Sequence, residues 1–155
     1  MLPPASFLDP TYQAALRARL DALTPTTARH WGTMTAHQML VHCADQIRVS
    51  TGLRPLTSVR IPRLLRPLAK WFFITRGGGS FKPNMRTMKE LDANAAMSKP
   101  TEFAADRAAL VALLDPARYA GQAGIDHPLF GYLPLPEFGR LTASHLDHHL
   151  RQFGL

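Results

Sequence analysis

Three histidines, His145, His148 and His149, stand within five residues in the stretch "SHLDHHLRQFGL". On a helix, residues four apart lie on one face with Cβ atoms about 6 Å apart, so His145 and His149 would point the same way. His148 lies about 100° round the helix from His149 and is expected to face outward. Two inward imidazoles and a third from another helix would form a three-histidine metal site with open positions for water or substrate, which is the catalytic type of arrangement.

The third histidine must come from elsewhere, and spacing alone leaves the choice open. The candidates are His30, His37, His42 and His127. Periodicity slightly favours His42, which lies between Met39 and Gln46 at the margin of an apolar helix face. His127 precedes a proline and is expected in a loop. A single His-x-x-x-His pair also arises often by chance on helices that bind no metal.

Capping signals set the bounds of the helices that would position these side chains. The first predicted helix, in "DPTYQAALRARLDAL", takes Asp9 as its N-cap and Pro10 as its first residue. The second begins with a capping box of Thr35 and Gln38 and stops at Gly52. Both carry apolar residues at helical spacing and are expected to pack through that face.

Two further helices complete the predicted fold. The third takes Thr101 as its cap and ends before Asp115 and Pro116, and the last runs from about Leu135 to about Phe153. Proline-rich and glycine-rich stretches, notably "RGGGSFKPN" and "GQAGIDHPLFGYLPLP", are interpreted as connectors. Four amphipathic helices without strands predict an all-α fold, a four-helix bundle whose core offers side chains for a central site.

The chain between the second and third predicted helices is longer than a bundle requires. Residues 53–97 are predicted to form a basic excursion, with an extra helix at 62–75, that packs outside the bundle. From position 46 to position 89 the chain has no acidic residue and ten basic ones: Arg48, Arg54, Arg60, Arg63, Arg66, Lys70, Arg76, Lys82, Arg86 and Lys89. Arg60, Arg63 and Arg66 recur at helical spacing opposite apolar residues, which is the pattern of an amphipathic basic helix.

This basic excursion supports a rival class of function. A non-catalytic binding protein could use it on nucleic acid, on an anionic membrane or on another anionic partner. Two other interpretations are a surface helix that buries its apolar face on the bundle, and a wall of the metal pocket that attracts an anionic co-substrate. The residues that would steer an anion are Arg54, Arg60, Arg63, Arg66, Arg76 and Lys82.

Length and composition indicate one domain, residues 1–155, with 46% hydrophobic residues. The single cysteine, Cys43, excludes an intrachain disulfide and fits a reducing compartment. The opening "MLPPASFLDP" lacks the basic and apolar regions of a secretory signal. The longest apolar stretch, "LLRPLAKWFFI", is interrupted by Arg66, Pro67 and Lys70, which argues against a membrane span. A cytoplasmic protein is expected.

Two stretches resemble a known family: "WGTMTAHQMLVHCADQIRVSTG" and "HPLFGYLPLPEFGRLTASHLDHHLRQFGL". With "FLDPTYQAALRARLDALTP" they cover about half of the chain and resemble a small bacterial branch, catalogued as a domain of unknown function, of the DinB/YfiT-like superfamily of metalloenzymes. The pattern rests on His145, His149 and Gln152 together with an upstream Met-Leu-x-His. The resemblance implies a four-helix bundle with a divalent metal on one histidine of the second helix and two of the last, here His42, His145 and His149.

The resemblance also implies metal-dependent chemistry on small molecules. Zinc and nickel are the expected metals, and imidazole suits both. A bound cation lowers the pKa of a coordinated water or deprotonates a thiol, and members of the superfamily transfer low-molecular-weight thiols such as bacillithiol, mycothiol or glutathione. The expected function is a thiol-linked transferase or a hydrolase. Its substrate would be a small molecule, either anionic or a low-molecular-weight thiol, with a homodimer as a further option.

Two polar residues are candidates for supporting the metal ligands. Asp45 lies one turn after His42, and Gln152 lies three residues after His149. Each could orient an imidazole or a bound water, or could occupy an ordinary solvated position. Cys43 is adjacent to His42 and therefore points away from it, so it is expected to be a buried structural thiol.

Overall fold

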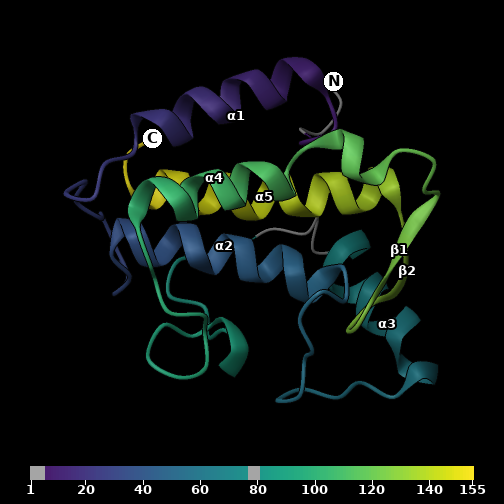
Figure 1. Cartoon of the computed structure of the whole chain (residues 1–155). Coiled ribbons are helices and arrows are strands. Elements are labelled where there is room, and N and C mark those ends of the chain that lie inside the picture. Colours follow the sequence, from purple (N-terminus) through teal and green to yellow (C-terminus); the bar gives the residue numbers. More distant parts are fainter. Residues whose placement is uncertain (1–5, 77–80) are drawn as a thin grey trace.

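The chain folds around four longer helices (Figure 1). The structure is a computed structural model that describes residues 6–76 and 81–155. The longer helices are α1 (Pro10–Ala22), α2 (Ala36–Ser50), α4 (Phe103–Leu113) and α5 (Leu135–Gln152). In Figure 1, α1 lies on one side of α4 and α5, and α2 lies on the other. Because α2 packs against both α4 and α5, side chains of α2 and α5 meet in the interior.

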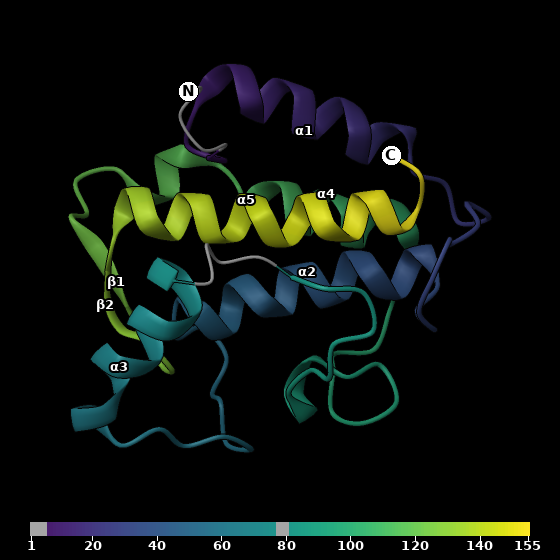
Figure 2. The same cartoon turned by 180° about the vertical axis from the view of Figure 1, so that it is seen from behind.

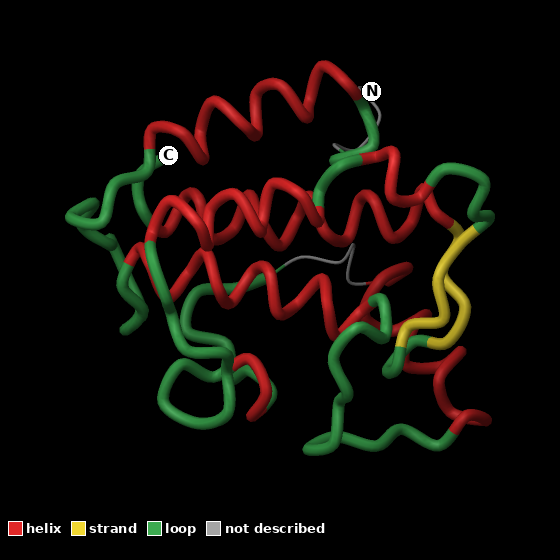
Figure 3. Tube along the Cα trace, in the orientation of Figure 1, coloured by secondary structure: helices red, strands yellow, loops and turns green. Residues whose placement is uncertain are grey.

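A two-stranded antiparallel sheet precedes α5, so the prediction of an all-α four-helix bundle is wrong. Its strands, β1 (Gly124–His127) and β2 (Gly131–Pro134), run side by side (Figure 3). Their register pairs Ile125 with Leu133. Both of these side chains are buried while the residues next to them in each strand are more exposed, as expected for a period of two. Gly131, with φ 69°, takes the left-handed conformation that favours glycine and allows the chain to turn back. The fold therefore combines helices with a small sheet.

The helix-capping predictions hold for α2 and fail for α4. Gln38 donates its backbone N–H to the Thr35 hydroxyl at 3.1 Å, and its side chain accepts from the Thr35 backbone at 2.9 Å, which completes the capping box. The N-cap of α4 is Glu102 rather than Thr101, because the Glu102 carboxylate accepts the first free backbone N–H groups. Thr101 instead donates its backbone N–H to Asp106 at 2.8 Å.

Among its described residues, the excursion between α2 and α4 contains four helical turns or short helices, and the first three lie at the position of the predicted extra helix. These are a 3-10 turn (Arg63–Leu65), α3 (Arg66–Lys70), a π-helical stretch (Trp71–Arg76) and a second 3-10 turn (Lys89–Leu91). Figure 2 shows much of this region on the side of α2 that faces away from α1. The excursion therefore does not extend the layer of long helices.

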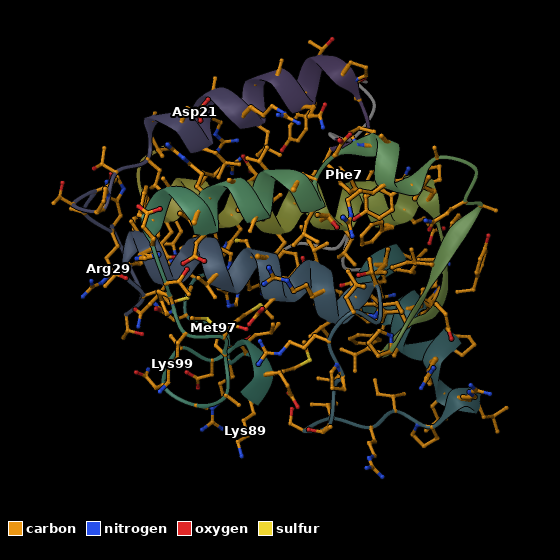
Figure 4. All side chains as sticks on the ribbon, in the orientation of Figure 1. Phe7, Asp21, Arg29, Lys89, Met97 and Lys99 are labelled. Carbon is orange, nitrogen blue, oxygen red and sulfur yellow. The ribbon has the colours of Figure 1, made fainter. Side chains whose placement is uncertain are left out.

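Buried polar contacts tie the excursion together. Glu90 is buried, and its carboxylate accepts backbone N–H groups from Thr57 at 2.9 Å and from Ser58 at 2.8 Å. Residues 57–58 and the turn at Glu90 are thereby held side by side. Figure 4 shows the labelled Lys89, which belongs to the same turn, on the far side of α2 from α1.

Aromatic side chains fix the segment that precedes α1. Phe7 is fully buried, with its ring centroid 5.5 Å from that of Tyr119 and 5.7 Å from that of Phe138 (Figure 4). These edge-on contacts join it to a 3-10 turn (Pro116–Tyr119) and to α5. Within the described part of the chain, no helix combines the length and the apolar character needed to cross a bilayer.

Candidate metal centre

Three buried histidines meet between α2 and α5. His42 comes from α2, and His145 and His149 come from α5, one turn apart. One ring nitrogen of each lies within 4.8 Å of the others, and Nε2 of His42 is 3.2 Å from Nε2 of His145. Their exposed fractions are only 4%, 5% and 7%. The structure thus places together the three residues that were expected to hold a metal.

Hydrogen bonds fix which nitrogen of two rings carries the proton. His42 Nδ1 lies 2.8 Å from the carbonyl oxygen of Leu91, which can only accept, so Nδ1 donates and Nε2 keeps its lone pair. His149 Nδ1 donates to Oε1 of Gln152 at 2.9 Å, and Nε2 of Gln152 donates to the carbonyl of Trp31 at 2.8 Å. The second bond turns the amide so that its oxygen faces His149. Both rings therefore present an Nε2 lone pair.

The third ring, His145, is differently placed. Its Nδ1 is buried and has no hydrogen-bond partner among the described residues. Its Nε2 faces the lone pair of His42 Nε2 and can donate to it when no cation is bound. The ring of Phe81 packs edge-on against His145, with centroids 4.8 Å apart, and keeps water from this side. Ligation through Nε2 would place the His145 proton on Nδ1.

The three imidazoles are held in the neutral form that metal binding requires. Burial is the main cause, because it disfavours the charged ring, and it lowers the pKa of His42 and of His145. For His149, burial and the proximity of His42 lower the pKa to about 3. All three rings are therefore uncharged near neutral pH.

The histidines open onto a cavity of about 620 Å³ whose wall is largely apolar. Residues 81–82 and 84–88 of the excursion form part of this wall, together with side chains of α2, α5 and the hairpin. Its apolar lining includes Phe73, Phe81, Phe130, Met88 and Leu141. A cavity of this size and character suits a small organic molecule.

Few of the predicted anion-steering residues lie at this cavity. Lys82 lines it, and so does Arg86, which is not among the predicted anion-steering residues. The other five, which do not line it, are Arg54, Arg60, Arg63, Arg66 and Arg76. The spacing of basic residues identified a charged surface and gave no indication of which charges face inward.

Of the two residues that were predicted to support the metal ligands, Gln152 is hydrogen-bonded to a histidine of the centre and Asp45 is not. Gln152 accepts a hydrogen bond from Nδ1 of His149 through Oε1. The carboxylate of Asp45 is fully buried but accepts from Arg48 at 3.0 Å, from Arg54, and from the backbone N–H of Ser98 at 2.8 Å. It forms no hydrogen bond to a histidine in the described part of the chain. Arg54 is therefore a structural partner of Asp45.

The remaining histidines and the cysteine occupy other environments. His37 lies 2.7 Å from Asp106 in a partly exposed pair. His148, expected to face outward, is half-buried and lines the cavity beside Trp31. Cys43 is fully buried, and burial raises the pKa of its thiol, so it is a poor nucleophile as expected.

The sequence did not predict a further polar group at the cavity, and His127, which was expected in a loop, ends strand β1. His127 is buried in the hairpin, with its Nε2 3.1 Å from the hydroxyl of Ser50. Gln46 donates to the same hydroxyl at 2.8 Å. The available signal was the spacing of His42, Gln46 and Ser50, which are four residues apart along one face of α2.

Comparison with known proteins places the chain in a family. Among the curated proteins and the solved structures there is no significant match. The family model described as "Protein of unknown function (DUF1569)" matches residues 8–154, a range that includes all three histidines of the candidate metal centre. The chain therefore belongs to the DUF1569 family.

Proposed function

We propose that the protein binds one divalent cation through His42, His145 and His149 and uses it to act on a small molecule in the cavity. The observation that carries this proposal is the meeting of three buried histidines, each with a ring nitrogen within 4.8 Å of the others, while the hydrogen bonds on Nδ1 of His42 and of His149 leave Nε2 of both rings with a lone pair. Two nitrogens at about 2.0–2.1 Å from a tetrahedral ion would lie about 3.4 Å apart. The 3.2 Å between His42 and His145 is close to that value.

Zinc and nickel are the proposed cations, because neutral imidazoles suit both. Three protein ligands leave at least one coordination position for another molecule. A cation there would lower the pKa of a water or thiol that binds it. We also propose that the chain belongs to the DinB/YfiT-like superfamily, because its His-x-x-x-His-x-x-Gln pattern resembles the one in that superfamily. The activity that we propose is accordingly that of a thiol-linked transferase or a hydrolase.

The residues around the centre have roles of their own in such an activity. Gln152 and the Leu91 carbonyl hold two imidazoles in the ligating tautomer. Phe81 and the other aromatic residues of the wall exclude water from the reacting group. Lys82 and Arg86 place positive charge at the cavity and favour an anionic substrate.

The metal content of the protein tests the proposal. Protein made without an affinity tag should contain about one equivalent of zinc or nickel per chain by elemental analysis. His145→Ala and His149→Ala should each abolish this content, whereas the matched control His148→Ala, next to the centre on the same helix, should retain it. Loss of metal in the control alone, or no metal in the parent, would contradict the proposal.

A second candidate function is attachment to an anionic membrane surface through residues 59–76. Leu64, Leu68 and Phe72, spaced four apart, are exposed to 89%, 61% and 66%. Arg60 and Arg63 lie beside them and form no salt bridge with any described residue. Exposed leucine and aromatic residues flanked by arginine are typical of helices that lie at a lipid surface. Co-sedimentation with anionic but not with neutral vesicles is the expected result.

A further inference from the structure

A stripe of polar residues runs along the cavity side of α2. His42, Gln46 and Ser50 follow one another at intervals of four residues, and all three are buried and line the cavity. With a rise of about 1.5 Å per residue, the stripe is about 12 Å long. Only His42 belongs to the candidate metal centre, so the two other residues need a separate explanation.

The far end of the stripe is a hydrogen-bonded group closed by the hairpin. His127 Nδ1 accepts the backbone N–H of Leu129 at 3.2 Å, so its proton is on Nε2, which donates to the Ser50 hydroxyl at 3.1 Å. Gln46 Nε2 donates to the same hydroxyl at 2.8 Å. His127 is therefore the donor in its hydrogen bond with Ser50, and it cannot act as the base that would activate the Ser50 hydroxyl.

One polar atom in this group has no partner. Oε1 of Gln46 is buried, and none of the described residues donates to it. If the amide is turned over, Oε1 accepts from the Ser50 hydroxyl and Nε2 becomes the group without a partner. In either orientation Gln46, which is exposed to only 9%, has one unsatisfied amide group at the cavity wall. Buried polar groups of this kind are normally satisfied, and a ligand can supply the missing bond.

We propose that Gln46, Ser50 and His127 form a second subsite, which recognises a neutral polar group of the substrate such as a hydroxyl or a carboxamide. None of the three carries a charge, and the open amide group matches a partner that can both donate and accept. The ring of Phe130 stacks on His127 with centroids 4.6 Å apart and provides a flat apolar wall beside the subsite.

This inference extends the proposed function and names a substrate class for it. The substrate has an apolar body, a ligating atom at one end, and a neutral polar group about 6–12 Å away, the distance from His42 to one or two helical turns further along α2. The claim about the metal-bound end rests on the proposed function. The claim about Gln46 rests on the hydrogen bonds at the far end alone.

A pair of probes that differ by one hydroxyl tests the subsite in the metal-free protein, where no cation can compete for that hydroxyl. Benzyl alcohol and toluene differ by one hydroxyl, and their dissociation constants can be measured by NMR titration of ¹⁵N-labelled protein. The affinity for benzyl alcohol relative to toluene should fall about fivefold to tenfold in Gln46→Met, which keeps the side-chain length and removes the amide. The exposed Gln122→Met is the matched control and should leave this ratio unchanged.

The side-chain amide signals of Gln46 in the wild-type protein give a second measurement that needs no variant. Benzyl alcohol should shift these signals, and toluene should shift them much less. An equal affinity ratio in wild type and Gln46→Met, undisturbed Gln46 signals, or no binding of benzyl alcohol would each overturn the inference. Because the titrations use metal-free protein, the result is independent of whether His42, His145 and His149 hold a metal.

Discussion

The cavity and residues 59–76 depart from the usual distribution of side chains in opposite ways. The cavity buries polar residues, among them His42, His145, His149, Gln46 and His127. Residues 59–76 expose apolar ones, namely Leu64, Leu65, Leu68, Trp71 and Phe72. Buried polar groups and contiguous exposed apolar groups are both unfavourable in an isolated soluble domain. We therefore propose a partner for each region, polar or cationic in the cavity and apolar with negative charge at the segment.

The two regions also differ in how their polar atoms are satisfied. In the cavity, most buried polar atoms form hydrogen bonds with other protein atoms. Nδ1 of His145 and one amide group of Gln46 have no hydrogen-bond partner among the described residues. In the segment, Lys70 pairs with Glu137 at 2.7 Å, while Arg60 and Arg63 extend from the surface without a salt bridge to any described residue. A small specific ligand fits the first pattern and an extended charged surface fits the second.

Removing the exposed apolar residues should have the largest effect. Each of Leu64 and Phe72 would contribute about 1.5–3 kcal/mol if it were buried in lipid, so Leu64→Ser with Phe72→Ser should weaken binding to vesicles of phosphatidylcholine and phosphatidylserine by about 100-fold or more. The free energy of unfolding should hardly change, because both side chains are exposed. Vesicle co-sedimentation and urea denaturation measure the two quantities.

The matched control for this experiment is Leu53→Ser with Tyr132→Ser, two exposed residues outside the segment. Unchanged vesicle binding in the Leu64→Ser, Phe72→Ser variant would contradict membrane attachment through residues 59–76. Retention on duplex DNA in place of vesicles, abolished by Arg60→Gln with Arg63→Gln, would instead favour nucleic acid as the partner.

The second prediction concerns the pH dependence of stability that the buried polar region imposes. Burial, with a smaller contribution from Arg66, lowers the pKa of His127 to about 4 from 6.5. Between these values the unfolded chain binds more protons than the folded one, so the contribution to stability is complete above pH 6.5 and is lost as the pH falls toward 4. At 1.36 kcal/mol per pKa unit, the loss is about 3 kcal/mol.

Urea denaturation of the metal-free wild type and of His127→Gln at pH 7.5 and at pH 4 measures this loss. The difference in free energy of unfolding between the two proteins should shrink by about 3 kcal/mol at the lower pH. A difference that stays constant over this range would show that His127 has the same pKa in the folded and in the unfolded chain.

Loss of the support for His149 should have the next largest effect. Gln152→Leu removes the acceptor that holds the proton of His149 on Nδ1, and the affinity for zinc should fall about 10-fold to 100-fold. Competition with a chelator measures this affinity. Gln152→Glu keeps an acceptor and should restore most of it, whereas equal affinity in the wild type and Gln152→Leu would mean that the amide does not orient the ligand.

The smallest expected effect is on the binding of an anion, and it distinguishes the positive charges at the cavity from those of residues 59–76. Lys82→Gln with Arg86→Gln removes charge at the cavity and should weaken binding of an anionic probe, benzoate, about threefold at low salt and less at high salt, where screening is stronger. Metal content should not change. Arg60→Gln with Arg63→Gln is the control, since neither residue lines the cavity. An equal loss in both variants, measured by calorimetry, would show a general charge effect.

Local sequence signals predicted the long helices well and missed the hairpin. Capping residues such as Thr35 act within a few positions of the chain, so the sequence contains the whole signal. The hairpin was interpreted as a connector because proline and glycine dominate its composition. Its strands are only four residues each, which is too short for a clear alternation of apolar and polar residues in the sequence. Ile125 and Leu133 are buried because of how the hairpin packs on the rest of the fold.

For the site, the sequence by itself determined that His145 and His149 share one helix face and that Gln152 follows at the spacing of a supporting residue. Spacing could not select His42 from the other candidate histidines, and the resemblance to a family made that choice. Asp45 was equally plausible by spacing, yet its carboxylate binds Arg48 and the backbone of Ser98.

Only the tertiary structure decided which distant groups meet. It brings Nε2 of His42 to 3.2 Å from that of His145, more than a hundred residues later, and places the carbonyl of Leu91 so that it holds the proton of His42 on Nδ1. It also closes the hairpin over Ser50, so that His127 and Gln46 share one hydroxyl. The physical reason is that helix periodicity orients a side chain relative to its own helix, whereas its partners depend on how separate elements pack.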